Sequence, residues 1–177
     1  MYKLLITILL SFILVQQEPM MPWNPQDKID WSDFKAEPQQ NADVIAVTAS
    51  GLSFGYSTTR FSNGTIDYNF DVTAHFYPEK SYYLRDHVTE ITLDHERLHF
   101  DITELHARKF RQRVQNTKFT KRIDDEMEVI NREINQQLRQ MQKAYDDETS
   151  HSRILPKQMA WQKYVSQELE KFKQYSD

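Results

Sequence analysis

Two histidines spaced four residues apart, with a glutamate directly after the first, are the side chains whose types and spacing predict chemistry in this chain. They are His95, Glu96 and His99. On a helix, side chains four residues apart project from the same face, so both imidazoles can bind one Zn²⁺ ion. A glutamate beside the first histidine can face a water molecule that the ion activates and take its proton. The motif therefore predicts a zinc site with His95 and His99 as ligands and Glu96 as general base.

Catalytic zinc sites usually have three protein ligands and a water molecule, so a third ligand is expected. Because the chain contains no cysteine, this ligand is a histidine or a carboxylate. His106 follows on the same predicted helix, but it lies about 10 Å beyond His99 along the axis, too far to share the ion. We expect His106 to line the cleft or support a ligand, or else to be a buried packing residue.

The polar segment 146–152 follows the next predicted helix and is the expected source of the third ligand. If the two helices are antiparallel, a helix of about 30 residues returns the chain to the level of His95. His151 is the preferred ligand because imidazole suits Zn²⁺, and Asp146 and then Glu148 are the alternatives. Asp146 can instead orient a ligating imidazole. A solvated acidic loop that ends a helix is the competing interpretation of this segment.

The predicted reaction turns the carbonyl oxygen of the substrate into an oxyanion, which zinc and one further hydrogen-bond donor stabilise. Such a donor must lie beside the ion, so its identity depends on how distant segments meet. The candidate donors are Tyr145, Tyr82, Tyr83 and His106, and the sequence does not distinguish among them.

The elements that must position these residues are two strands followed by three helices. Residues 44–58 are rich in β-branched and small residues and predict a strand with bends or bulges at Gly51 and Gly55. A hairpin turn at Asn63–Gly64 leads to a clearly alternating strand, residues 66–76.

Helices are predicted from about residue 86 or 87 to 115, from 117 to 145, and after Pro156. The first of them is apolar on two sides, which is typical of a helix sandwiched between layers. The expected fold class is α+β, with a small antiparallel sheet packed on the helix that carries the zinc motif, plus two further long helices.

Composition indicates one globular domain and limits its partners. The chain has 177 residues, of which 39% are hydrophobic and 27% charged. Its net charge is -4, with both signs mixed along the helices, so no basic face is available and nucleic acid is excluded as a main partner. The lack of cysteine also excludes disulfide bonds.

The N-terminal residues predict export. Lys3 precedes an apolar run, Leu4 to Val15, that is too short to span a bilayer comfortably, so residues 1–17 are expected to be a signal peptide. An uncleaved membrane anchor is the alternative, and it would be the chain's only contact with a membrane. Residues 18–30 are expected to be a linker and residues 31–177 the functional domain. The expected location is secreted or periplasmic, in the bacterial cell envelope.

Several stretches of the chain are similar to one known family. It is a family of secreted bacterial proteins that is catalogued as domain of unknown function 922 and described as secreted zinc-dependent protease-like. The stretches that carry the resemblance are Trp31–Phe34, Ala46–Gly51, His95–Ile102, Tyr145–His151 and Gln158–Trp161. The resemblance implies a zincin-like fold and supports His151 or Asp146 as a functional position. This sequence departs from the family pattern at Ser152, where glycine is usual, and at Tyr82, where tryptophan is common.

The leading hypothesis is a secreted or envelope zinc-dependent metallohydrolase, a peptidase whose substrate is a peptide or protein. Its basis is the complete ligand–base–ligand motif of His95, Glu96 and His99, in a chain that begins with a predicted export signal. The alternative is a non-catalytic zinc-binding envelope protein, which would need no base and would be closed to water. A metal-free helical interaction module is a third hypothesis, supported only by the long amphipathic helices.

Overall fold

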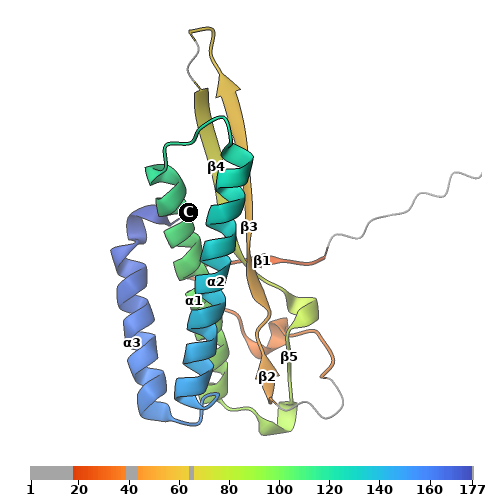
Figure 1. Cartoon of the computed structure of the whole chain (residues 1–177). Helices are drawn as coiled ribbons and strands as arrows, with labels where there is room; N and C mark the ends of the chain where they lie inside the picture. The colour runs from red at the N-terminus through yellow and green to blue at the C-terminus, as the bar shows by residue number, and fades with distance from the viewer. Residues whose placement is uncertain (1–17, 39–43, 64–65, 177) are drawn as a thin grey trace, which may run out of the picture.

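The computed structural model describes residues 18–38, 44–63 and 66–176. The predicted signal segment, residues 1–17, and Gly64 of the predicted hairpin turn lie outside these ranges. The chain has an α+β fold in which a small antiparallel sheet packs against three helices (Figure 1). The helices are α1 (Glu90–Asn116), α2 (Ile123–Thr149) and α3 (Leu155–Lys171), with short 3₁₀ helices η1 (Trp31–Asp33), η2 (Pro78–Lys80), η3 (Arg85–His87) and η4 (Lys173–Tyr175).

The main sheet has three antiparallel strands in the order β1 (Met21–Pro22), β4 (Ile66–Phe76) and β3 (Ser50–Arg60). Strands β3 and β4 pair without interruption, so the bulges expected at Gly51 and Gly55 are absent. A Cβ atom at Gly51 would meet the ring of Tyr77 at 3.3 Å. Close packing therefore accounts for this glycine.

A second, two-stranded sheet pairs β2 (Ala46–Val47) with β5 (Tyr82–Tyr83). The single strand expected over 44–58 is thus divided into β2 and β3. The division falls at Ala49, whose N–H donates to Ser81 Oγ at 3.0 Å and whose C=O accepts from the Tyr77 N–H at 2.9 Å. These partners lie about 30 residues away, so the local sequence carried no signal of the break.

The alternating strand expected over 66–76 is confirmed as β4. Its inward residues Val72, Ala74 and Phe76 are buried against α1, which has β4 on one side and α2 and α3 on the other. The outer half of the β3–β4 hairpin extends beyond the helices (Figure 1), and there Phe61 is 50% exposed and Ile66 is 38% exposed.

Helix α1 begins at Glu90, later than expected. Its N-cap is Thr89, whose hydroxyl accepts from the Thr92 N–H at 3.3 Å, while the Thr92 hydroxyl accepts from the Thr89 N–H at 3.2 Å. This reciprocal pair satisfies two backbone donors at the helix end, so the start is fixed there.

Helix α2 continues to Thr149 rather than ending at Tyr145, so Asp146 and Glu148 are helical and not in a loop. The hydroxyl of Thr149 donates to the carbonyl of Tyr145 at 2.7 Å within this last turn. Ser150 then ends the helix in the left-handed conformation, with φ 50°.

Residues 18–30 are not a free linker, because they pack on the domain. The Trp23 N–H donates to the carbonyl of Ala74 at 3.0 Å, and its indole Nε1 donates to Asp101 at 2.7 Å. Ile29 is only 2% exposed. Within the described ranges, none of the helices has both the length and the hydropathy needed to cross a bilayer.

Candidate metal centre

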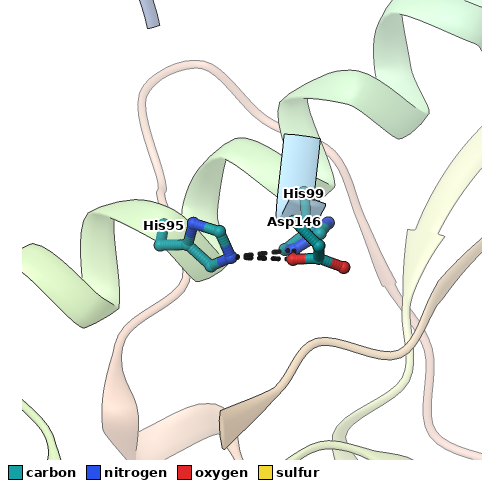
Figure 2. Close-up of side chains that lie close together, drawn as sticks. All are labelled: His95, His99 and Asp146. Atoms are coloured by element: carbon teal, nitrogen blue, oxygen red, sulfur yellow. Dashed lines mark hydrogen bonds and ion pairs between the residues drawn. The ribbon is translucent and has the colours of Figure 1, made fainter. Parts of the chain in front are cut away.

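The three side chains of the motif lie on α1 and are almost fully buried, with exposed fractions of 2% for His95, 4% for Glu96 and 7% for His99. The last turn of α2 brings Asp146 against both imidazoles (Figure 2). Its Oδ1 lies 3.0 Å from His95 Nε2 and 3.0 Å from His99 Nε2. The two Nε2 atoms are 3.2 Å apart. In the part of the chain that the structure describes, this is the only group of three or more histidine, aspartate or glutamate side chains whose ligand atoms lie close enough to hold one metal ion.

The spacing of these atoms suits zinc. Ligand atoms placed about 2.0–2.1 Å from Zn²⁺ at tetrahedral angles are about 3.3–3.4 Å from one another. The observed separations of 3.0, 3.0 and 3.2 Å are close to this value. The residues present therefore fit three corners of a zinc tetrahedron and leave the fourth corner for another group.

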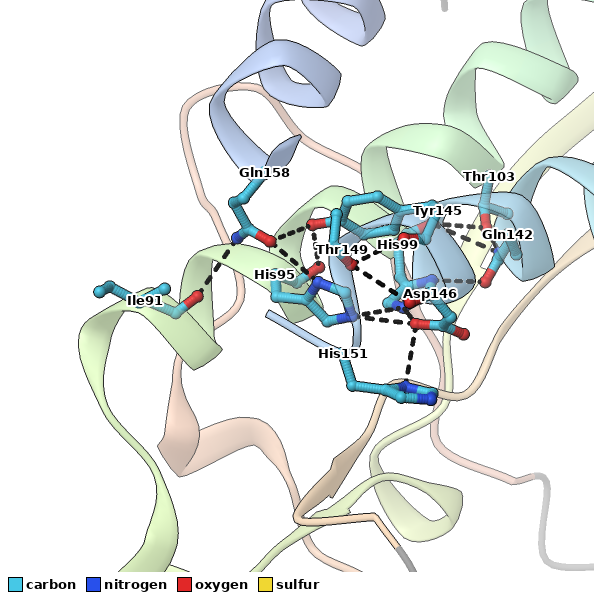
Figure 3. Close-up of polar contacts among 10 residues, drawn as sticks. All are labelled: Ile91, His95, His99, Thr103, Gln142, Tyr145, Asp146, Thr149, His151 and Gln158. Atoms are coloured by element: carbon cyan, nitrogen blue, oxygen red, sulfur yellow. Dashed lines mark hydrogen bonds and ion pairs between the residues drawn. The ribbon is translucent and has the colours of Figure 1, made fainter. Parts of the chain in front are cut away.

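Gln158 on α3 determines which nitrogen of His95 carries the proton (Figure 3). Its Oε1 accepts from His95 Nδ1 at 3.0 Å, and its Nε2 donates to the carbonyl of Ile91 at 3.3 Å. A neutral imidazole has one N–H, so a proton on Nδ1 leaves Nε2 with a lone pair that faces Asp146.

Gln142 on α2 does the same for His99. Its Oε1 accepts from His99 Nδ1 at 2.8 Å, while its Nε2 donates to the hydroxyl of Thr103 at 3.1 Å. When both imidazoles are neutral, two lone pairs and one carboxylate oxygen therefore converge, an arrangement that a cation stabilises.

Neither glutamine was expected to have a role from the sequence alone. Gln142 precedes Asp146 by four residues and so shares its face of α2, which is the signal that could have revealed it. Gln158 begins one of the stretches that resemble the family, but that stretch gave no chemical role.

The electrostatics of the centre favour positive charge. Burial alone would raise the pKa of Asp146, but hydrogen bonds with His95 and His99 and the charges of these imidazoles hold it well below its usual range. Burial would lower the pKa of His99, yet the hydrogen bond with Asp146 and the charges of Glu96 and Asp146 raise it. Without a metal, a proton can therefore occupy the position that suits a cation.

Tyr145 packs against His95 in the protein interior. It is completely buried, its ring stacks on His95 with centroids 4.3 Å apart, and its hydroxyl donates to Gln158 Oε1 at 3.0 Å. Burial, reinforced by the carboxylates of Glu96 and Asp146, raises the pKa of this phenol far above its ordinary value. Its predicted role as oxyanion donor does not fit this position.

Glu96 lines a cavity of about 160 Å³ together with His95, His99 and Asp146. Segment 44–48, which contains β2, forms another part of the wall, and the loop residues His151 and Ser152 complete it. Among the described residues, none forms a hydrogen bond with the Glu96 carboxylate, so this group is available to a ligand in the cavity.

His151, the preferred third ligand, lies at the rim instead. Its Nδ1 is 3.4 Å from Asp146 Oδ1, and its side chain is 48% exposed (Figure 3). The structure thus places Asp146 where His151 was expected. The reason is that α2 continues past Tyr145, which brings Asp146 into the centre and leaves His151 beyond the helix end, at φ 51°.

The remaining candidates lie outside the cavity wall. Glu148 accepts from Trp161 Nε1 at 3.1 Å. His106 is a buried packing residue: its Nδ1 donates to the carbonyl of Ile102 at 2.8 Å, and burial lowers its pKa to about 4. Tyr82 pairs with Val47 in the small sheet, and Tyr83 stacks on Trp31 with centroids 4.6 Å apart.

A larger cavity of about 780 Å³ lies between α1, α3 and the N-terminal segment. Its walls include Trp23, Asp101 and Arg108. None of His95, His99 and Asp146 lines this cavity, so we place the candidate site at the smaller one.

Fold and site together define an α+β protein whose first two helices assemble a group of two histidines and one aspartate with the spacing of metal ligands. The chain belongs to the family of bacterial proteins of unknown function called DUF922, whose family model matches residues 26–152. That range contains His95, Glu96, His99 and Asp146. No curated protein matches the chain, and no solved structure matches it either.

Proposed function

We propose that this protein is a zinc-dependent metallohydrolase of zincin-like design that cleaves peptides outside the cytoplasm. The observation that carries the proposal is the convergence of His95 Nε2, His99 Nε2 and Asp146 Oδ1 within 3.0–3.2 Å, next to an unpaired Glu96 in an open cavity. Zinc, when bound, acts as a Lewis acid and lowers the pKa of a water molecule toward neutrality.

The protein's own residues supply the remaining functions. Glu96 accepts the proton of the attacking water and passes it to the leaving amine, because its carboxylate faces the same cavity as the ligands. His95 and His99 are held in one orientation by Gln158 and Gln142, so no reorganisation is needed when a substrate arrives.

Two further features support the proposal. The family that the chain resembles is described as secreted and zinc-dependent protease-like, and this description supports a peptide or protein substrate. The apolar run from Leu4 to Val15 supports export to the cell envelope or beyond.

A non-catalytic zinc-binding protein is the second candidate, and His151 favours it. With Nδ1 3.4 Å from Asp146 Oδ1, a small rotation of this imidazole would let it take the fourth corner and close the site. The open cavity and the buried, unpaired Glu96 favour the hydrolase.

The test compares wild type with Glu96→Gln, which keeps the shape of the side chain but removes the base. Both proteins are expected to contain about one zinc per chain, and only wild type is expected to cleave unfolded casein. Loss of a general base costs about 10²–10⁴-fold in rate. Equal cleavage by the two proteins would exclude Glu96 as the base.

X-ray absorption of the zinc-loaded protein separates the two candidates. The hydrolase predicts two histidines, one carboxylate and one water molecule around the metal. A second arm measures zinc affinity in His151→Ala, which should be unchanged. Four protein ligands, together with weaker zinc binding in this variant, would favour the non-catalytic protein.

A further inference from the structure

Exposed apolar side chains gather where the loop after α2 leads into α3. Among the described residues, nine large hydrophobic side chains are exposed, and four of these form one apolar patch: Ile154, Leu155, Met159, which is 60% exposed, and Tyr164. The patch lies at the end of the molecule where α2 and α3 join (Figure 1). Single exposed hydrophobic residues are normal on a protein surface, whereas a cluster of them marks a contact with an apolar partner.

The fold does not account for the first two residues of the patch. Ile154 is the N-cap residue of α3, and Leu155 begins the helix. Serine, threonine, aspartate and asparagine are preferred at an N-cap because their side chains accept a backbone N–H, and no side chain caps α3 in this way. Both residues are exposed, so they add little to the core. A departure from a local rule without a gain in packing indicates a functional role.

The patch is surrounded by positive charge that no carboxylate balances. Residues 149–167 contain Arg153, Lys157 and Lys163 but no aspartate or glutamate, in a chain whose net charge is -4. None of these three cations forms an ion pair with a described residue, whereas Lys143 and Lys171 each pair with a carboxylate. The charge around the patch therefore favours an anionic partner.

Two aromatic side chains lie beside these cations. Trp161 and Tyr164 pack edge to face with ring centroids 5.8 Å apart, and together with Lys157 and Ala160 they line an open hollow of about 430 Å³. Glu148, the one acidic residue in this wall, accepts from the indole of Trp161. Tryptophan and tyrosine are enriched at the level of lipid headgroups, and apolar side chains flanked by lysine and arginine are typical of segments that lie in the membrane interface.

We propose that this end of the molecule docks on an anionic lipid surface. Ile154, Leu155 and Met159 enter the headgroup layer, and the cations around them contact lipid phosphates. The sequence pointed only to the N-terminal apolar run as a membrane contact, so this is a second contact, made by the folded domain. Because His151 and Ser152 of the same loop line the candidate metal site, docking holds the rim of that cavity close to the lipid.

The test uses the absence of cysteine to place one fluorescent label at a time in the full chain. Met159→Cys carries an environment-sensitive NBD label in the patch, and Val129→Cys carries it on an exposed position near the other end of α2. With vesicles of equal parts phosphatidylglycerol and phosphatidylcholine, the label at position 159 is expected to brighten and shift to shorter wavelength, and the label at position 129 is not. Since the label reports its own surroundings, retention of residues 1–17 does not affect the comparison.

Removal of charge gives the matched comparison, with the label at position 159. Arg153→Gln combined with Lys157→Gln should raise the lipid concentration for half-maximal signal roughly thirtyfold, because each basic residue near an anionic surface contributes about a factor of five. Lys118→Gln combined with Lys121→Gln removes the same charge from exposed positions before α2 and should leave this concentration unchanged. Vesicles of phosphatidylcholine alone should bind wild type more weakly.

Three results would overturn the proposal. The first is no response at position 159, or an equal response at both label positions. The second is an equal effect of the two charge-removing pairs, which would attribute binding to overall charge. The third is a shift at position 159 that appears without vesicles and grows with protein concentration, which would assign the patch to a second copy of the chain.

Docking and the proposed function fail independently, because docking requires neither a metal nor hydrolysis. Zinc content and casein cleavage are measured on the same unlabelled wild type. If zinc or cleavage is absent while the label at position 159 responds as expected, the hydrolase is wrong and docking stands. If cleavage is normal and the label does not respond, docking alone is wrong.

Discussion

At the scale of single residues, the proposed metal centre depends on two neutral glutamines as much as on its charged groups. The Oε1 atoms of Gln158 and Gln142 each accept a hydrogen bond from the Nδ1–H of one imidazole, and their amide N–H groups donate elsewhere, so neither amide can flip without losing a hydrogen bond. Partners of this kind set the tautomer and the orientation of ligating histidines.

Gln158→Leu is therefore expected to weaken zinc binding by roughly ten- to a hundredfold, because the buried Nδ1 of His95 loses its acceptor. Competition with a chromophoric chelator measures the zinc Kd. Gln162→Leu is the matched control, since Gln162 lies one turn later on α3 and lines the other cavity. Equal zinc Kd values for the two variants would show that His95 does not depend on Gln158.

The loop after α2 contains strained backbone at a residue that the resemblance had marked as unusual. Ser150, His151 and Ser152 all have positive φ, with 70° at Ser152. This conformation costs an L-residue roughly 1–2 kcal/mol, while glycine adopts it freely. A left-handed backbone favours glycine, which is the residue that the family resemblance implies at this position.

Ser152→Gly is expected to stabilise the protein by roughly 0.5–1 kcal/mol, which is the relieved strain less the entropy that glycine adds to the unfolded chain. Urea denaturation of the metal-free protein measures the change. Ser152→Ala is the control, because alanine keeps the strain and should bring no gain. A gain of the same size in both variants would attribute it to loss of the hydroxyl.

At the scale of elements, the sequence predicted what depends on local periodicity and missed what depends on distant partners. The alternation in β4 and the two-sided apolar pattern of α1 were sufficient to predict both elements. The helical spacing on α1 also predicted that His95 and His99 lie side by side. The break between β2 and β3 depends on Ser81 and Tyr77, and the docking of residues 18–30 depends on Asp101 and Ala74. No pattern within those segments reveals such contacts.

The end of α2 shows why the sequence favoured His151 over Asp146 as the third candidate ligand. Acidic residues are unfavourable at the C-terminal end of a helix dipole, so Asp146, Asp147 and Glu148 indicated that the helix had already ended. The structure offsets this cost by placing Asp146 between two imidazoles and Asp147 beside Lys143, at 2.7 Å. The helix continues for one more turn as a result.

Metal removal is accordingly expected to loosen this turn in particular. Without zinc, the charge on Asp146 is balanced only by protonated imidazole, and hydrogen exchange of amides 146–149 should become at least about tenfold faster. Amides 130–138 of the same helix serve as the internal control, because Ile130, Ile134 and Leu138 are buried in the core. Amide hydrogen exchange along α2, measured with and without EDTA, tests this expectation. A uniform change along the helix would contradict a local role of zinc.

At the scale of the whole molecule, one buried cluster on α1 ties the layers together. Glu104 Oε1 accepts from Arg108 Nε at 2.8 Å and from Arg111 Nη1 at 3.2 Å. The two arginines also donate to backbone carbonyls of other elements: Val72 in β4, Leu169 in α3 and Tyr175 in η4. Sheet, helix and C-terminal segment are therefore all joined to α1 through two arginines that one carboxylate holds in place.

Glu104→Ala is expected to destabilise the fold by about 3–5 kcal/mol, because it removes the buried carboxylate that accepts from Arg108 and Arg111. Zinc affinity should change little in protein that remains folded, since the metal ligands bond to Gln142 and Gln158 rather than to this cluster. Glu133→Ala is the control: its carboxylate pairs with Arg113 at 2.6 Å but is 43% exposed, and an exposed pair is worth about 0–1 kcal/mol. Urea denaturation without metal measures both variants, and a loss in Glu104→Ala no greater than in Glu133→Ala would show that the cluster does not hold the layers together.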